Sequence, residues 1–504
     1  MLTQRTAHGV SAMLVANVLG RIAGLAAQII TGFALLDTEF GVYAMAIGIT
    51  TVAGLFRGGE IQNYLVSLPP ARRRFRTGSA FWLAEIFTLS GVIPTLLLAP
   101  TLASWLEQPG IVPILWILST TMLLAPVRFV LYARLNAELR FSSVAKSTLI
   151  NTLVQYPLII ILALTLGNAL ALCIPVLIGV VVELVYLLIK VRPVRSDFLP
   201  SWRLMPGVLY RIRWLVAVAA MMSLWTSGDY LVAEFFVPAN ILGVYYFGYQ
   251  LAVQPGRLFM ITVTNIIIPV VRRVGEDSAR LRSVTKRLIG TGGFAIASVN
   301  IAMLAGIAPL EALIWKGKWD DSVFAVQVLS IGLTYTAILG IATSILMAER
   351  RYLESLASNA VRALAVMVGA GTGAMIWADV DGIATTVSIS MGVAGIGTTA
   401  WLGTRYGVPL LSTVPHLLRC TLPVIVAGLL SAWLGEWMLE RIDWGRGSAI
   451  LAGIASGGLY GTLLLLSLRI LPQQTRKEIL SLVPARFRPI LQFFAGQREA
   501  TQDS

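Results

Sequence analysis

Apolar stretches of about 20 residues recur along the whole chain, separated by short polar segments. A helix of about 20 residues crosses a hydrocarbon core about 30 Å thick. The stretches are continuously apolar and do not alternate with polar residues, so they predict helices and exclude a β-barrel. We expect about 14 membrane-spanning helices. They fall at residues 9–36, 40–67, 78–99, 111–132, 143–166, 169–189, 214–236, 243–270, 288–308, 323–347, 356–378, 382–403, 420–438 and 449–471.

The composition agrees with this pattern. Of the 504 residues, 57% are hydrophobic and only 13% are charged. A soluble domain carries about 25% charged residues, which it needs to cover its surface. The composition therefore excludes a soluble enzyme, a secreted disulfide-rich domain and a disordered chain. It predicts an all-α polytopic membrane protein.

The placement of the basic residues predicts the orientation. The net charge is +14, with 39 Lys and Arg residues against 25 Asp and Glu residues. If the N-terminus is cytoplasmic, most basic residues fall on the cytoplasmic side, as the positive-inside rule requires. The outer turns then hold only Lys316, Lys318, Arg441 and Arg446. We therefore expect both termini in the cytoplasm, a multi-pass protein of the bacterial inner membrane, and membrane lipids rather than nucleic acid beside its basic loops.

Two parts of the chain repeat the same order of residues. Gly-Val-Tyr opens the second predicted span at 41–43 and the eighth at 243–245. Arg57, Pro69 and Arg72-Arg73 recur 200 residues later, at positions 257, 269 and 272–273. Both copies run from the outer face to the cytoplasm, so they predict two parallel six-helix lobes related by an axis along the membrane normal.

This repeat gives a division of the chain into five regions. A basic cytoplasmic linker separates the two lobes, and two further membrane helices and an amphipathic cytoplasmic tail follow them. The regions are residues 1–189, the N-terminal lobe; 190–213, the linker; 214–403, the C-terminal lobe; 404–471, the two extra helices; and 472–504, the tail.

Four of the arginines inside predicted spans are candidates for a substrate site. An ionisable group at the centre of a bilayer costs about 2.5–3.5 kcal/mol, so such groups face the protein interior and often have a function. Guanidinium groups bind phosphate bidentately and stay charged when desolvated. Arg21, Arg57, Arg257 and Arg362 therefore predict a cavity that binds an anion such as a pyrophosphate. The alternative is structural pairing with nearby acids.

Four acidic residues supply the possible pairs. Glu60 lies three residues after Arg57, and Asp229 in the seventh span faces the eighth span, which holds Arg257. The other two are Glu85 and Glu183, in the third and sixth spans. Each of the four is a candidate for ion coupling or for charge pairing, and a structural role is favoured for Glu85 and Glu183.

Sequence motifs for catalysis are missing. The chain contains no P-loop, no His-Glu-x-x-His and no Gly-x-Ser-x-Gly. The two cysteines and two histidines have no metal-ligand spacing. We therefore expect no enzyme activity, no metal and no cofactor, and a driving force supplied by an ion gradient, the membrane potential or the substrate gradient.

The segment 223–274 resembles the polysaccharide transporter, or oligosaccharide flippase, family (Wzx-like) of the multidrug/oligosaccharidyl-lipid/polysaccharide exporter superfamily. The likeness rests on Asp229, Leu-Gly-Val-Tyr at 242–245, Pro269 and Arg272-Arg273. The segments EFGVYAMA at 39–46 and LRFSSVAKSTLI at 139–150 extend it. The resemblance implies the two-lobed fold of the MATE transporters. It also implies alternating-access transport of undecaprenyl-pyrophosphate-linked oligosaccharides, with a polysaccharide polymerase as a candidate partner.

Three other functions remain open at this stage. A lipid II flippase of the same superfamily also uses arginines in its cavity, and by resemblance this supports Arg21, Arg57 and Arg257. A cation-coupled multidrug exporter of the same fold would favour an acidic cavity, against which the arginines argue. A membrane glycosyltransferase or ligase would need a large outer loop, and none of the predicted outer loops is long enough.

Overall fold

The structure is a computed structural model that describes residues 2–56, 58, 60–257, 278–349, 351–442 and 444–482. Every regular element within these ranges is a helix. Twelve helical segments of the described chain are long and apolar enough to cross a membrane. The predicted all-α polytopic fold is therefore confirmed.

The second predicted span, 40–67, is divided and is not among those twelve segments. Its first part is α2 (Asp37–Ala53) and its second part is the short helix α3 (Glu60–Ser67). Between them Gly58 has φ = +74°, a left-handed conformation that residues with a Cβ rarely adopt. The glycine therefore permits the break, which apolar periodicity alone does not reveal.

The eighth predicted span, 243–270, is the other one that is not among the twelve segments. It begins as α10 (Ala239–Ala252), and residues 258–277 lie outside the described part of the chain.

The chain divides into two compact units, with the boundary inside α10. The N-terminal unit is Met1–Tyr246 and the C-terminal unit is Phe247–Ser504. Besides α2, α3 and the start of α10, the N-terminal unit contains α1 (Leu2–Ala34), α4 (Pro70–Trp105), α5 (Ile111–Leu123), α6 (Ala125–Ala137), α7 (Phe141–Leu166), α8 (Leu170–Val191), the 3-10 turns η1 (Arg195–Asp197) and η2 (Trp202–Leu204), and α9 (Met205–Ala233). The C-terminal unit contains α12 (Ser278–Ile314), η3 (Asp320–Ser322), α13 (Val323–Ala348), α14 (Tyr352–Ile376), α15 (Val380–Arg405), α16 (Leu410–Arg441), α17 (Arg446–Ser467) and α18 (Gln473–Leu482).

In the N-terminal unit, α1 packs along α7 at two glycines one turn apart. A Cβ on Gly20 would lie 3.3 Å from the hydroxyl oxygen of Thr152, and one on Gly24 would lie 3.0 Å from that of Tyr156. Small residues four positions apart let membrane helices approach closely. This contact fixes the segment that carries Arg21.

The two Gly-Val-Tyr motifs meet where the start of α2 crosses the start of α10. A Cβ on Gly41 would lie 1.8 Å from the carbonyl oxygen of Ala239, and one on Gly243 would lie 1.8 Å from that of Asp37. Each motif thus needs glycine because the partner's backbone touches it. This reciprocal contact between equivalent segments supports the predicted duplication, and the superposition of the two lobes stays a prediction.

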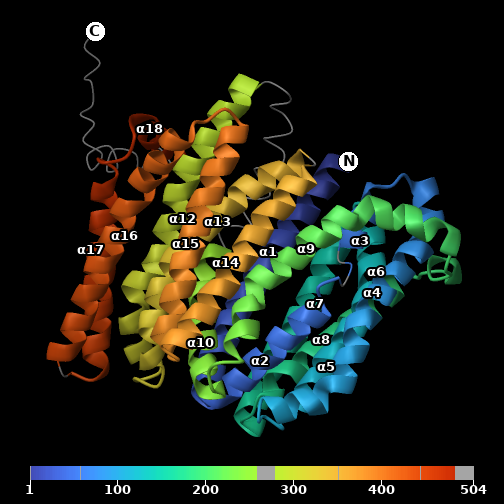
Figure 1. Ribbon diagram of the computed structural model, residues 1–504, viewed down its shortest axis with the longest axis horizontal. Coiled ribbons are helices and arrows are strands. Elements are labelled where there is room, and N and C mark those ends of the chain that lie inside the picture. The colour runs from blue at the N-terminus through green and yellow to red at the C-terminus, as the bar shows by residue number, and fades with distance from the viewer. Residues whose placement is uncertain are drawn as a thin grey trace. The chain divides into compact units, whose positions relative to one another are not determined.

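In the C-terminal unit, α12, α13, α15 and α16 surround an apolar core, and α14 covers α15 (Figure 1). The buried core includes Ile296, Leu339 and Val424. The first turns of the predicted tail form α18, whose Leu480 is buried in this core. On the same helix Glu478 pairs with Arg287 of α12 at 3.0 Å, so α18 is held to the bundle by apolar and charged contacts.

Candidate functional site

The carboxylate of Glu183, on α8, has several polar partners in the N-terminal unit. Its side chain is buried, with the residue 1% exposed, and Arg128 of α6 pairs with it at 2.5 Å. Ser147 Oγ donates a hydrogen bond to Oε1 at 3.1 Å, and Asn151 Nδ2 donates to Oε2 at 3.3 Å. The hydroxyl of Tyr132 also donates to Oε1. A buried charge is tolerated when it is paired and hydrogen-bonded in this way.

Helical spacing explains why these five residues meet. Arg128 and Tyr132 are four residues apart on α6, and so are Ser147 and Asn151 on α7. Residues at this spacing lie on one face of a helix, so each helix directs two polar groups toward Glu183. The arrangement favours charge pairing over ion coupling for Glu183. Arg128 was missed by the sequence analysis, because nothing in the sequence shows which acid its helix faces.

A pocket lined by hydroxyl groups lies between α2, α5, α8 and α9. It has a volume of about 460 Å³. The hydroxyl residues in its wall are Thr50, Thr51, Thr121, Ser223, Thr226 and Ser227. All but Ser227 donate their hydroxyl proton to a carbonyl of their own helix, over 2.7–3.2 Å. Their oxygens still have lone pairs, so this wall presents acceptors and suits a ligand that donates O–H groups.

The predicted acid of the seventh span lies in α9 and is fully buried. Asp229 is 0% exposed, and Tyr245 of α10 donates a hydrogen bond to its Oδ2 at 2.8 Å. Its Oδ1 has no hydrogen-bond partner within the described chain. The predicted pair with Arg257 joins residues of different units and stays a prediction.

The C-terminal unit has a buried polar stripe on α14. Ser355, Ser358, Asn359 and Arg362 lie at i, i+3, i+4 and i+7, on one face, and all four are buried. Arg362 is 6% exposed and donates to Asn359 Oδ1 at 3.5 Å and to the carbonyl of Thr336 at 3.4 Å. Both of these acceptors are neutral oxygens.

Gly256, the residue before Arg257, packs against a second buried polar group of this unit, the amide of Asn300 on α12. A Cβ on Gly256 would lie 2.9 Å from Asn300 Oδ1. Asn300 is buried, and both polar atoms of its side chain lack hydrogen-bond partners within the described ranges. Asn300 therefore offers an amide that can both donate and accept, beside the backbone that precedes Arg257.

The remaining predicted site residues are placed as follows. Arg21 lies half-buried on α1, and Glu85 lies half-buried on α4. Glu60 begins α3 and accepts a hydrogen bond from Asn63 at 2.8 Å. Arg57 lies outside the described residues, so its predicted pairing with Glu60 stays a prediction.

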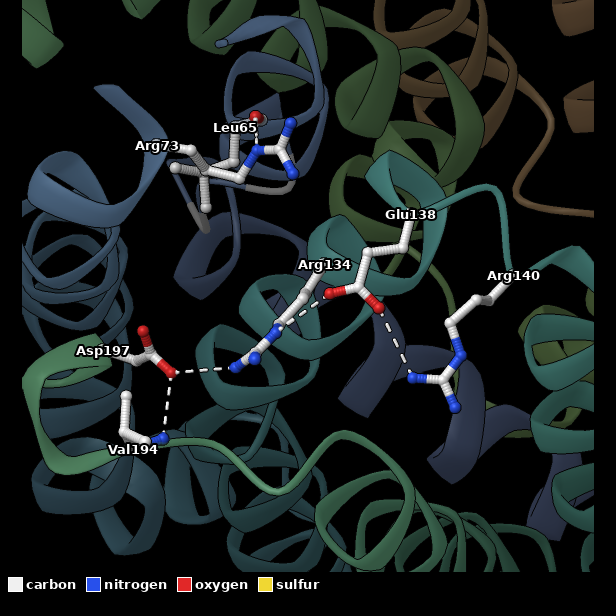
Figure 2. A network of polar contacts seen from close by, with 7 residues as sticks. All are labelled: Leu65, Arg73, Arg134, Glu138, Arg140, Val194 and Asp197. Atoms are coloured by element: carbon white, nitrogen blue, oxygen red, sulfur yellow. Dashed lines mark hydrogen bonds and ion pairs between the residues drawn. The ribbon is translucent and has the colours of Figure 1, made fainter. Parts of the chain in front are cut away.

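A network of charged side chains ties the predicted linker to α6 and the turn after it (Figure 2). Arg134 binds Glu138 at 3.2 Å and Asp197 at 3.3 Å, and Glu138 also binds Arg140 at 3.4 Å. Asp197 accepts the backbone N–H of Val194 at 3.0 Å. The linker is therefore held to the N-terminal unit at η1. Exposed ion pairs of this kind each contribute about 0–1 kcal/mol.

No metal site is visible in the part of the chain that the structure describes. Within it, no three His, Cys, Asp or Glu side chains come together as a metal ion would require. The described sites offer guanidinium, carboxylate, amide and hydroxyl groups, which can bind ligands.

The fold and these polar sites define a multi-pass membrane transporter built from helical bundles. A model of the family described as "Polysaccharide biosynthesis protein" matches residues 35–324, more than half of the chain. The chain therefore belongs to this family of Wzx-like polysaccharide transporters.

Two curated proteins are similar to the chain. It is 20% identical over 364 residues to the lipopolysaccharide biosynthesis protein WzxC of Escherichia coli strain K12, covering 69% of this chain and 71% of WzxC. It is 19% identical over 420 residues to an uncharacterized membrane protein in the cps region of Klebsiella pneumoniae, covering 79% of this chain and 84% of that protein.

Solved structures show the same fold. The inward closed conformation of the lipid II flippase MurJ matches with a TM-score of 0.69 at 15% identity, covering 90% of this chain and 98% of MurJ. An inward-facing multidrug resistance MATE transporter matches with a TM-score of 0.59 at 16% identity, covering 78% of this chain and 96% of that chain. The predicted MATE-like fold is thus confirmed, and at these identities the likeness concerns the fold alone.

Proposed function

We propose that the chain is a flippase for undecaprenyl-pyrophosphate-linked oligosaccharides. It moves each unit from the inner to the outer leaflet of the bacterial cytoplasmic membrane by alternating access, for exopolysaccharide or lipopolysaccharide O-antigen synthesis. Membership of the polysaccharide transporter family over residues 35–324 is the observation that carries this proposal. The two termini are cytoplasmic, as the charge distribution predicts.

The substrate has an anionic part and a sugar part, and the described sites suit both. Arg21, Arg57, Arg257 and Arg362 bind the pyrophosphate. Support for this role comes from Arg362, whose side chain is buried. A desolvated guanidinium binds an anion more strongly than an exposed one.

The sugar part is bound by the hydroxyl-lined pocket of the N-terminal unit. Because most of its hydroxyl protons are already donated within the helices, the pocket accepts hydrogen bonds from sugar O–H groups. The same wall disfavours a phosphate, whose oxygens only accept. The two parts of the substrate are thereby directed to different sites.

Of the four candidate acids, the structure supports different roles. Glu183 has a complete set of partners, which favours structural pairing. Asp229 keeps one oxygen without a partner within the described chain, which favours ion coupling. Glu60 and Glu85 stay candidates for either role.

Complementation of a deletion strain tests the pyrophosphate site. Arg21→Ala should reach the membrane at the wild-type level and fail to restore surface polysaccharide. Arg21→Lys should restore it only in part, because an ammonium group cannot reproduce the planar fork of guanidinium. Full restoration by Arg21→Ala would remove this residue from the site, and loss of the protein from the membrane would favour a structural role.

A lipid II flippase is the second candidate function, since MurJ has the same fold. The same strain distinguishes the two. Loss of surface polysaccharide with normal growth and cell shape supports the oligosaccharide flippase, whereas lysis supports lipid II transport.

A further inference from the structure

A largely apolar pocket of about 760 Å³ lies between α2, α4 and the end of α9. It is separate from the hydroxyl-lined pocket and shares none of its lining residues. Several apolar residues at its rim, including Phe56, Leu98 and Phe235, are exposed. Leu98 belongs to α4, which is long and apolar enough to cross a membrane, so the pocket lies beside a candidate membrane span.

One acidic residue lines this pocket from within. Glu234 directly follows α9 and is only 5% exposed. Neither of its carboxylate oxygens has a hydrogen-bond partner within the described chain. Gly48 of α2 provides the room, since a Cβ there would lie 3.0 Å from Glu234 Oε2.

Such a carboxyl group is ionised only beside a positive charge, and without one it holds a proton. Taking an ion out of water costs several kcal/mol unless a partner compensates it. The described lining of the pocket contains no Lys, Arg or His, and its other ionisable residue, Glu107, is also acidic. Even the two hydroxyl groups in the wall, Ser90 and Thr95, donate to carbonyls of α4 and offer only acceptors. The pocket therefore favours a positively charged occupant.

The rest of the wall favours an occupant with a large apolar body. The lining of α4 runs from Phe87 to Trp105, which corresponds to about 27 Å of helix. The rings of Phe56 and Phe87 lie 6.4 Å apart at one end, and Trp105 lines the other. Aromatic faces attract cations as well as apolar groups.

We propose that this pocket binds organic monocations with an apolar body, such as amphiphilic amines, and that Glu234 is their counterion. The ligand enters from the lipid, fills the apolar wall and places its charge at the buried carboxylate. The charge it selects is opposite to that of the pyrophosphate in the proposed transport substrate, so this is a second binding site with its own ligand class.

Two ions of the same shape and opposite charge test the proposal. Tetraphenylphosphonium and tetraphenylborate are each titrated into the full-length protein in detergent, and saturable binding is measured by calorimetry. The same titration into micelles without protein is the control. Wild-type protein should bind the phosphonium at least tenfold more tightly than the borate. This comparison needs no variant, and equal affinity for the two ions would overturn the proposal.

Two substitutions test whether Glu234 supplies the negative charge that binds the phosphonium. Glu234→Gln should weaken phosphonium binding by about 10- to 100-fold, as expected for the loss of a charged partner. Glu107→Gln is the matched control at the exposed rim and should change the affinity less than about threefold, because water screens that charge. Phosphonium binding by Glu234→Gln at wild-type affinity would show a merely apolar pocket and would contradict the assignment.

Discussion

Two buried glutamates of the N-terminal unit have opposite surroundings. Glu183 is 1% exposed and bonds to Arg128, Tyr132, Ser147 and Asn151. Glu234 is 5% exposed and has no hydrogen-bond partner for either oxygen within the described chain. Burial of a charge costs stability unless partners compensate it. The comparison therefore separates an acid that holds the bundle together from one that is retained at a cost in stability, as expected for a binding group.

The largest expected effect is the removal of Glu183. Glu183→Leu should lower the free energy of unfolding by about 3–5 kcal/mol, because it leaves Arg128 without its buried partner. The midpoint of unfolding in a denaturing detergent titration measures this loss. The double variant Arg128→Met with Glu183→Leu is the control and should recover most of the stability, since it strands no charge. A double variant as unstable as the single one would contradict the pairing.

A single hydrogen bond to the same carboxylate should matter less. Tyr132→Phe removes the hydroxyl that donates to Glu183 and should cost about 1.5–3 kcal/mol, the range for hydrogen bonds to charged groups. The same unfolding titration measures it. In the Glu183→Leu background the substitution should have almost no further effect, and an undiminished loss there would show that Tyr132 acts elsewhere.

Substitution of Glu234 should change the free energy of unfolding in the opposite direction. Glu234→Met replaces an unbonded carboxyl group with an apolar side chain of similar length and should raise the free energy of unfolding by about 1 kcal/mol. Its effect is measured without added organic cations. A loss of stability comparable to that of Glu183→Leu would place Glu234 among the structural pairs and remove the contrast.

Much of the fold could be predicted from the sequence, because long apolar runs and glycine motifs report on local helix formation. The second span was predicted as one helix although it breaks at Gly58, since apolar patterning does not record φ. The functional sites were harder to predict from the sequence than the fold. Arg362 was recognised as a charge in an apolar run. Arg128 also lies in a predicted span, but its partner, like the hydroxyl-lined pocket, depends on which helices face each other.

Glu183 and Glu234 also show what could not be predicted from the sequence. Both are acids in apolar segments, and the sequence could not tell that α6 and α7 supply four partners to Glu183, whereas neither oxygen of Glu234 has a hydrogen-bond partner within the described chain. The tertiary packing of the helices decides which buried acid has partners.

The central claim, transport of a lipid-linked pyrophosphate oligosaccharide, is tested most directly in liposomes. Purified protein is reconstituted with a fluorescent undecaprenyl-pyrophosphate-linked oligosaccharide, and a membrane-impermeant quencher reports how much of it changes leaflet. We expect movement well above that of protein-free liposomes, lost in Arg21→Ala and retained in Glu234→Met. Movement no faster than in protein-free liposomes, or equal movement with Arg21→Ala, would contradict the account.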